Sequence, residues 1–139
     1  MNKMDVLHTL EQAFSIELKT SKILVVGLGK TGISVAAYLH DLGLEFALVD
    51  SRKKPPFNDV LLEKMPDVPV FTGRFEPTIF SLATHLVVSP GISMEEPVIQ
   101  QALVRGVIAL SDIDLFACST NKPIIAITGS NGKSTVTTL

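Results

Sequence analysis

The sequence has a single cysteine, Cys118, among its 139 residues, which excludes an intramolecular disulfide and fits a reducing compartment. No apolar run approaches the ~20 residues of a membrane span, and no basic segment followed by an apolar run marks a signal peptide. The formal net charge is −2, and no run of lysines and arginines suggests an anionic surface as a ligand. We therefore expect a cytoplasmic protein with no nucleic-acid partner, no membrane partner and no obligate protein partner.

Apolar residues make up 46% of the chain, and a domain of this length buries roughly two-thirds of its unfolded surface. Short apolar runs alternate with helical patterns, which predicts a Rossmann-like, doubly wound α/β fold: a mainly parallel sheet with helices on both faces. The predicted strands are residues 23–26, 45–49, 68–71, 86–88 and 107–110. The predicted helices are residues 4–18, 33–43, 78–82, 97–105 and a capped helix that begins after Ser111, with Asp114 three residues beyond the cap.

A glycine motif, G-x-G-x-x-G, follows the first predicted strand and leads into a helix, the order that gives this motif its meaning. Gly27 permits the tight turn, Gly29 lets a diphosphate approach the backbone, and Gly32 lets the helix pack closely on the strand. The N–H groups at the start of the helix would face the anion. The motif predicts a phosphate-binding loop, with a glycine-rich turn that binds nothing as the structural alternative.

Two polar segments follow predicted strands and are candidate parts of the same site. Asp50, about 20 residues after the glycine loop, stands where dinucleotide-binding folds recognise the ribose or base, and Arg52 could add a charge contact. Ser89-Pro90-Gly91 follows the fourth strand, at the carboxyl edge of the sheet where open α/β proteins bind ligands. Capping by Asp50 and ordinary turn chemistry are the structural alternatives.

A second nucleotide motif stands near the end of the chain, after the apolar run 124–127, and is typical of a P-loop for ATP. Lys133 would reach the β- and γ-phosphate oxygens and Ser134 would hold Mg²⁺. The motif departs from the full G-x-x-x-x-G-K-[ST] pattern, because Ile127 occupies the position five before Gly132. The predicted ATP-binding residues are Gly129, Ser130, Asn131, Gly132, Lys133, Ser134 and Thr135.

No acidic Mg²⁺ ligand in a following strand can be identified, because the sequence ends at Leu139. We therefore expect the chain to be the N-terminal part of a longer protein. Residues 1–21 would be a helical extension, 22–120 a nucleotide-binding domain, and 121–139 the first strand and P-loop of an ATP-binding domain. Without the rest of that domain, residues 123–139 are expected to fray, to lie against the first domain or to pair with a neighbour.

The two motifs, about a hundred residues apart, resemble those of the Mur ligases of peptidoglycan synthesis. The resemblance covers residue 22 to the end and depends on the segments GLGKTGIS, DSR, SPG, SDIDLF and ITGSNGKSTVTTL, of which the last is the most specific. In this family the first domain binds the UDP of the substrate and not a nicotinamide cofactor. The resemblance leaves Lys30 without an assigned role.

The resemblance implies specific roles for the candidate residues. The glycine loop would hold the diphosphate, residues 50–52 would surround the uridine, residues 89–91 would border the path of the sugar, and Asn131 would face the muramoyl side. The implied UDP-substrate residues are Gly27, Leu28, Gly29, Thr31, Gly32, Asp50, Ser51, Arg52, Ser89, Pro90, Gly91 and Asn131.

The resemblance also implies a reaction, an ATP-dependent amide-bond formation that joins D-glutamate to UDP-N-acetylmuramoyl-L-alanine through an acyl phosphate. Such phosphoryl transfer depends on positioning and charge neutralisation, so Lys133 and Mg²⁺ would be the main contributors to catalysis in this part of the enzyme. ATP and Mg²⁺ would serve the full-length enzyme. The present chain is expected to bind the UDP-sugar, to hold no cofactor tightly and to catalyse nothing.

Two other functions are compatible with parts of the sequence. An NAD(P)-dependent oxidoreductase would account for the glycine loop and Asp50, but it leaves residues 128–135 unexplained. A non-enzymatic Rossmann module that senses a nucleotide would also use the glycine loop, and the ATP-type loop argues against it for the whole protein.

Overall fold

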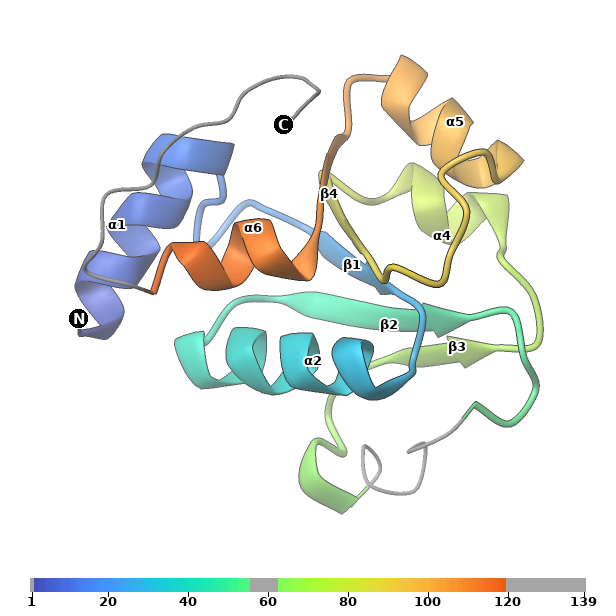
Figure 1. Cartoon of the computed structure of the whole chain (residues 1–139), viewed down its shortest axis with the longest axis horizontal. Coiled ribbons are helices and arrows are strands. Elements are labelled where there is room, and N and C mark those ends of the chain that lie inside the picture. The colour runs from blue at the N-terminus through green and yellow to red at the C-terminus, as the bar shows by residue number, and fades with distance from the viewer. Residues whose placement is uncertain (1, 56–62, 120–139) are drawn as a thin grey trace.

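The computed structural model describes residues 2–55 and 63–119. They form a five-stranded sheet in the order β3-β2-β1-β4-β5, in which all neighbouring strands are parallel (Figure 1). The strands are β1 (Ile23–Val26), β2 (Phe46–Asp50), β3 (Val70–Thr72), β4 (His85–Val88) and β5 (Ile108–Leu110). The order reverses between β1 and β4, and ligands of open α/β sheets bind outside the carboxyl ends of the strands at such a point.

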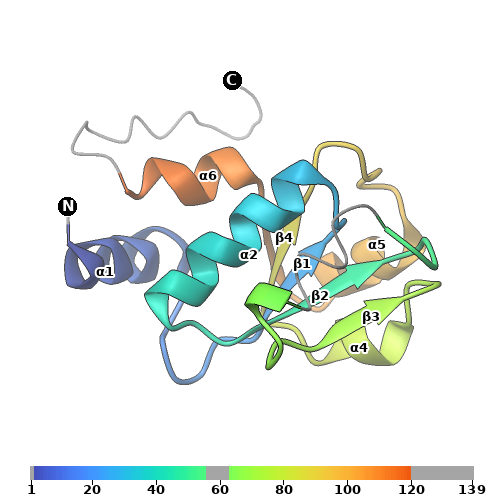
Figure 2. The same cartoon turned by 90° about the horizontal axis from the view of Figure 1, so that it is seen from below.

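Helices cover both faces of the sheet, as Figure 2 shows from below. The helices are α1 (Lys3–Phe14), α2 (Lys30–Leu42), α4 (Pro77–Ser81), α5 (Pro97–Val104) and α6 (Asp112–Ala117). One core cluster joins α1, α2 and α6 to the side of the sheet that carries Val25 and Leu48, and a second joins α4 and α5 to the side that carries Leu24 and Val26. Adjacent strand residues thus bury opposite faces, as in a parallel sheet covered on both sides. The predicted fold class is confirmed.

The N-terminal helix is shorter than the predicted span of residues 4–18. It ends at Phe14, because Ser15 adopts a left-handed conformation with φ 58° and its N–H group donates to the Glu11 carbonyl oxygen at 2.9 Å. Ile16 then folds back under the helix and is 1% exposed. The apolar spacing therefore identified a core residue correctly but assigned it to a helix that has already ended.

The other elements of the described residues lie where the sequence predicts them, with ends that differ by at most three residues, the largest difference being the start of α2 at Lys30. Gly43 ends α2 in a left-handed conformation with φ 77°. Val70–Thr72 is an edge strand preceded by Pro69, which suits a residue that cannot donate to a ladder. Ser111 begins α6 with a reciprocal capping box to Asp114, as predicted.

The predicted strand 124–127, the ATP-type loop and the predicted behaviour of residues 123–139 lie outside the described residues. None of the helices in residues 2–55 and 63–119 has the length and apolar character needed to cross a bilayer.

Candidate functional site

The glycine loop connects the end of β1 to the start of α2, and two of its glycines are required by the fold. Gly27 has φ 101°, and a Cβ atom there would lie 3.0 Å from the Ser89 side chain. A Cβ atom on Gly32 would lie 2.0 Å from the Gly27 carbonyl oxygen, which no ordered backbone could accommodate. The close approach of α2 to the loop therefore depends on the absence of a side chain at Gly32, as the motif predicts.

Gly29 and Gly91 differ from this pair, because the fold does not require glycine at either position. Gly29 caps α2 with φ −83°, Gly91 has no left-handed φ, and a Cβ atom at either residue would meet nothing within 4 Å. Both residues line the same cleft. They leave bare backbone open to a group that approaches closely.

The helix that follows the loop presents unused hydrogen-bond donors to this cleft. Its cap, Gly29, has no side chain to accept from the first turn. Within the described part of the chain, the backbone N–H groups of Gly29, Lys30 and Thr31 have no hydrogen-bond acceptor. Together with the helix dipole, such donors form a site for an anion.

Asp50, the last residue of β2, is 1% exposed, and its carboxylate is occupied by the chain itself. Oδ2 accepts from the Leu28 backbone N–H at 2.8 Å and from Arg52 Nη2 at 2.6 Å. Oδ1 accepts from the Arg52 backbone N–H at 2.8 Å and from Arg52 Nε at 2.9 Å. The carboxylate thus fastens the end of β2 to the glycine loop and orients Arg52.

The pKa of Asp50 reflects both its burial and these donors. Burial alone would raise the pKa of the carboxyl group. The hydrogen bonds from the Arg52 side chain and from the N–H groups of Leu28 and Arg52 outweigh burial, and the pKa lies below its usual value. The side-chain hydrogen bond to Asp50 and the charge of this carboxylate raise the pKa of the Arg52 guanidinium group. The pair is therefore a carboxylate and a guanidinium cation at neutral pH.

Two described residues of the predicted substrate set, Leu28 and Gly32, are not among the residues that line the cleft. Leu28 is part of the fold instead. The side chain is fully buried in the core beside α2, and the backbone N–H is the donor to Asp50. Gly32 is also buried, where its role is to let α2 approach the loop.

The third predicted segment, residues 89–91, is tied directly to the glycine loop. The Ser89 backbone N–H donates to the Val26 carbonyl oxygen at 3.0 Å, and Ser89 Oγ donates to the Gly27 carbonyl oxygen at 3.2 Å. These bonds bring the loop after β4 against the loop after β1, on the two sides of the point where the strand order reverses.

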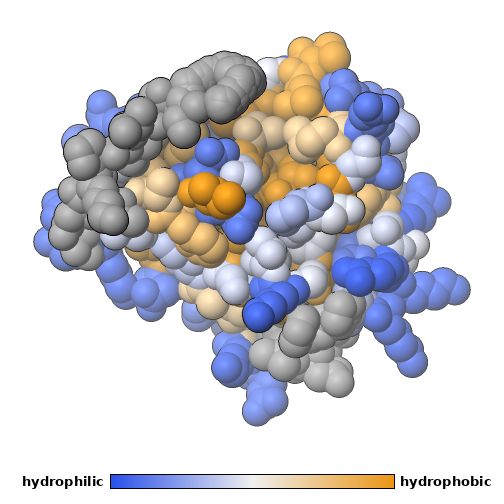
Figure 3. Space-filling view, viewed as in Figure 1, coloured by the Kyte–Doolittle hydropathy of each residue, from blue (hydrophilic) through white to orange (hydrophobic). Residues whose placement is uncertain are grey.

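The cleft at this edge has a volume of about 530 Å³. In Figure 1, α2 begins where β1 ends, and the loops after β2 and β4 flank that point. The space-filling view shows pale and hydrophilic residues beside an apolar region on this face (Figure 3). The lining residues are Gly27, Gly29, Lys30, Thr31, Asp50, Ser51, Arg52, Ser89, Pro90, Gly91 and Ile92.

The cleft thus gathers residues from all three segments that the sequence singled out. Lys30 and Ile92 line it as well, although neither belonged to the predicted set. Lys30 could have been found from its place inside the glycine motif, one residue after a glycine that faces the cleft. Ile92 directly follows the predicted segment 89–91, but its apolar side chain is not of a type that signals a site for a polar ligand.

A smaller cavity of about 300 Å³ adjoins the cleft and shares Ser89, Pro90 and Ile92 with it. It extends along the carboxyl edge of the sheet to Ser111 and Asp114 at the start of α6. The two hollows together are suited to a ligand longer than a nucleotide.

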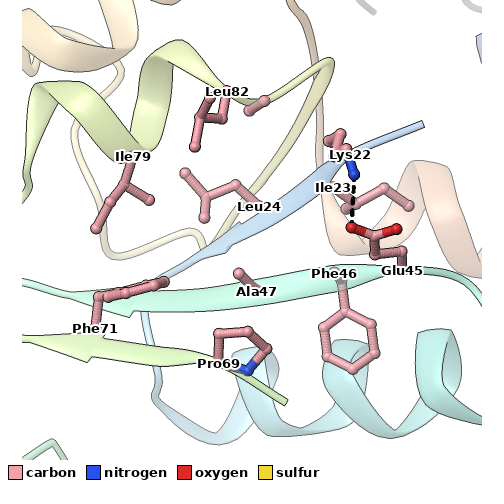
Figure 4. Close-up of a pocket in the computed structure, with 11 residues that line it drawn as sticks. Lys22, Ile23, Leu24, Glu45, Phe46, Ala47, Pro69, Phe71, Ile79 and Leu82 are labelled. Atoms are coloured by element: carbon pink, nitrogen blue, oxygen red, sulfur yellow. Dashed lines mark hydrogen bonds and ion pairs between the residues drawn. The ribbon is translucent and has the colours of Figure 1, made fainter. Parts of the chain in front are cut away.

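A cavity of about 470 Å³ lies elsewhere, between α4 and strands β1 to β3 (Figure 4). Its lining is mostly apolar, with Leu24, Phe71 and Ile79 among the lining side chains. At its rim Lys22 and Glu45, which precede β1 and β2, form an ion pair of 2.8 Å. None of the predicted site residues within the described ranges lines this cavity, so it is not the candidate site.

Asn131 and the predicted ATP-binding residues 129–135 lie outside the described residues. In the part of the chain that is described, no group of three or more His, Cys, Asp or Glu side chains could hold a metal ion.

Residues 21–111 match the family described as "Mur ligase MurD-like, N-terminal domain". The chain is 53% identical over 125 residues to the UDP-N-acetylmuramoylalanine–D-glutamate ligase of Marinobacter nauticus, an alignment that covers 90% of this chain and 28% of that one. It is 50% identical to the ligase of the same name from Methylococcus capsulatus, over 86% of this chain and 26% of that one. The chain therefore spans about a quarter of the length of these curated relatives.

Solved structures of similar shape have low sequence identity to this chain. L-tryptophan dehydrogenase from Nostoc punctiforme has a TM-score of 0.51 and 15% identity, over 84% of this chain and 42% of that one. Shikimate dehydrogenase from Aquifex aeolicus has a TM-score of 0.50 and 17% identity, over 82% of this chain and 50% of that one. At such identities the likeness shows the Rossmann-like fold alone.

The family match covers well over half of the chain, including β1 to β5 and all three segments that line the cleft. The chain therefore belongs to the Mur ligase family, which it matches through a MurD-like N-terminal domain.

Proposed function

We propose that this chain binds the UDP portion of UDP-N-acetylmuramoyl-L-alanine, as part of a ligase that adds D-glutamate to that substrate with the use of ATP. The names of the relatives supply the substrate class, and the cleft supplies a place for it. Residues 22–120 would be the substrate-binding domain, residues 1–21 an extension, and residues 121–139 the start of the ATP-binding domain.

The observation that carries the proposal is the bare backbone at Gly29 and Gly91, on two loops of one cleft. Neither glycine has a left-handed φ or a neighbour that would exclude a Cβ atom, so a ligand that touches the backbone explains the lack of a side chain at both, beyond the modest preference for glycine at the cap of α2. The N–H groups of Gly29, Lys30 and Thr31 would then donate to the diphosphate.

The uridine end of the ligand would lie at Asp50, Ser51 and Arg52. Because the Asp50 carboxylate already accepts four hydrogen bonds, it can accept from a uridine only if Arg52 gives up part of its contact. The Arg52 side chain is 53% exposed, so it has room to turn toward a ligand. We propose that Arg52 and Ser51 meet the uridine first and that Asp50 holds the loop in place. Leu28 would contribute through packing and not through its N–H.

The sugar and the L-alanine would follow the path beside Ser89, Pro90 and Gly91 toward the smaller cavity. By the sequence motif, Asn131 would lie on the muramoyl side and residues 129–135 would bind ATP. In the proposed reaction, the alanine carboxylate takes the γ-phosphoryl group of ATP, and the D-glutamate amine then displaces phosphate to form the amide. Lys133 would stabilise the transferred charge and Ser134 would hold Mg²⁺, which neutralises the phosphates when bound.

The proposal is tested by titrating the isotope-labelled 139-residue chain, in separate runs, with UDP-N-acetylmuramoyl-L-alanine, NADH and ATP. We expect the UDP-sugar to shift the NMR signals of the glycine loop, residues 50–52 and residues 89–91. Tight binding of NADH without a response to the UDP-sugar would instead favour an oxidoreductase-type domain. A folded chain that responds to none of the three would also contradict the proposal.

A further inference from the structure

Three charged side chains line the cleft, and two of them neutralise each other. Asp50 and Arg52 form an ion pair of 2.6 Å. Lys30 is exposed and forms no ion pair or side-chain hydrogen bond with any residue of the described ranges 2–55 and 63–119. The net charge of the cleft lining is therefore the charge of Lys30, although the whole chain carries −2.

The place of Lys30 in α2 is unfavourable for the helix itself. It is the first residue of α2, where the helix dipole and the N–H groups already present positive charge, and acidic residues are the ones that stabilise this end. The first turn of α2 contains no acidic residue, as in α4 and α5, whereas α1 and α6 have aspartates there. Helix α1 also begins with a lysine, but Lys3 forms an ion pair with Asp41 at 3.8 Å. The folding of α2 therefore gives no reason for a lysine at this position.

An anion in the cleft would explain both the unpaired charge of Lys30 and the position of this lysine at the start of α2. The anion would lie between the N–H groups of Gly29, Lys30 and Thr31 and the Lys30 ammonium group, and each positive group would then contribute to its binding. We propose that Lys30 Nζ binds the diphosphate of the UDP-sugar and so sets the preference of the site for a diphosphate over an uncharged nucleoside. This inference rests on the proposed function, since it names a further residue of the same site.

A lysine contact of this kind has a distinct signature. The ammonium group is a compact charge on a flexible stem, and it attracts the phosphates without the fixed geometry of an arginine. Its contribution is screened by salt, because the cleft is open to water. Removal of the Lys30 ammonium group should therefore weaken the binding of diphosphate ligands selectively. This decrease in affinity should become smaller as the salt concentration rises.

The test is calorimetric titration of the 139-residue chain with UDP-N-acetylmuramoyl-L-alanine and with uridine. We compare the wild type, Lys30→Met, Lys30→Arg and Lys19→Met, of which the last removes the same charge from an exposed position that does not line the cleft. At about 20 mM NaCl we expect Lys30→Met to bind the UDP-sugar about fivefold more weakly, a loss that shrinks at about 500 mM. Lys19→Met should match the wild type, Lys30→Arg should keep most of the affinity, and uridine binding should not change.

The outcomes separate the two proposals. If the wild type binds the UDP-sugar and Lys30→Met binds it equally well, the inference about Lys30 is wrong and the proposed function stands. An equal loss in Lys30→Met and Lys19→Met would also overturn the inference, since it would reflect total charge. If the wild type does not bind the UDP-sugar, both proposals fail.

Discussion

The Asp50 carboxylate accepts a 2.8 Å hydrogen bond from the backbone N–H of Leu28, which lies 22 residues earlier in the chain. This bond joins the end of β2 to the middle of the glycine loop. The same carboxylate also holds the Arg52 guanidinium group, so one buried side chain sets the positions of two segments of the cleft. Asp50 is therefore part of the structure of the site before any ligand arrives.

Replacing Asp50 with asparagine should destabilise the protein. The amide of Asp50→Asn keeps one acceptor oxygen, but it loses the charge that Arg52 pairs with and turns a donor toward Leu28 or Arg52. We expect a loss of about 1–3 kcal/mol in the free energy of unfolding, measured by urea denaturation. Asp67→Asn, at an exposed position with no hydrogen bond among the described residues, is the control and should change little. Equal stability of Asp50→Asn and the wild type would contradict the structural role.

The stability that Asp50 provides should depend on pH in a defined direction. Because its pKa is lowered in the folded protein, the unfolded chain takes up the proton first as the pH falls. The stabilisation is complete above the unfolded value of about 3.9 and is lost as the pH falls through the folded value. The gap in unfolding free energy between the wild type and Asp50→Asn should be constant from neutral pH to about pH 5 and should narrow below about pH 4. If this difference in unfolding free energy stays constant down to pH 3, the ionised Asp50 carboxylate is not the source of the stabilisation.

Much of the fold follows from local sequence patterns. Residues 23–26 form a strand where four apolar residues precede the glycine loop, Gly43 ends α2 through its left-handed φ, and Ser111 and Asp114 cap α6. Each of these features depends on residues within a few positions of one another. For the same reason, the sequence placed the three segments of the cleft at the carboxyl edge of one parallel sheet.

Features that depend on distant contacts could not be predicted in this way. Ile16 belongs to the core through a chain reversal and not through helical spacing. His85 is buried at the start of β4, with Nε2 2.8 Å from the Phe14 carbonyl oxygen at the end of α1, although the two residues are 71 positions apart. Asp50 was correctly predicted to end a strand, but nothing near it shows that its carboxylate is occupied by Leu28 and Arg52.

Two glycines of the loop, Gly32 and Gly29, should lose different amounts of stability when each is replaced by alanine. Gly32→Ala would place a Cβ atom 2.0 Å from the Gly27 carbonyl oxygen, so α2 must move away from the loop. We expect a loss of about 2 kcal/mol or more in the free energy of unfolding. Gly29→Ala adds a Cβ atom where nothing lies within 4 Å, so its cost should be at most about 1 kcal/mol, because alanine is a poorer helix cap than glycine. Urea denaturation of both variants measures the difference, and equal losses would contradict the assignment of distinct roles to the two glycines.

Lys30→Met should make the protein slightly more stable and should lower its affinity for the UDP-sugar. The substitution removes a cation from the positive end of α2 and breaks no ion pair among the described residues. At low salt we expect a gain of about 0.3–1 kcal/mol in the free energy of unfolding without ligand, and a smaller gain at high salt. Lys19→Met, outside any described helix, is the matched control and should show no such gain. If Lys30→Met were less stable than the wild type, the lysine would serve the fold, and the argument that its position is explained by an anion would fail. A gain in stability together with a loss of affinity for the UDP-sugar would show that the chain keeps this charge for binding at a cost to the helix.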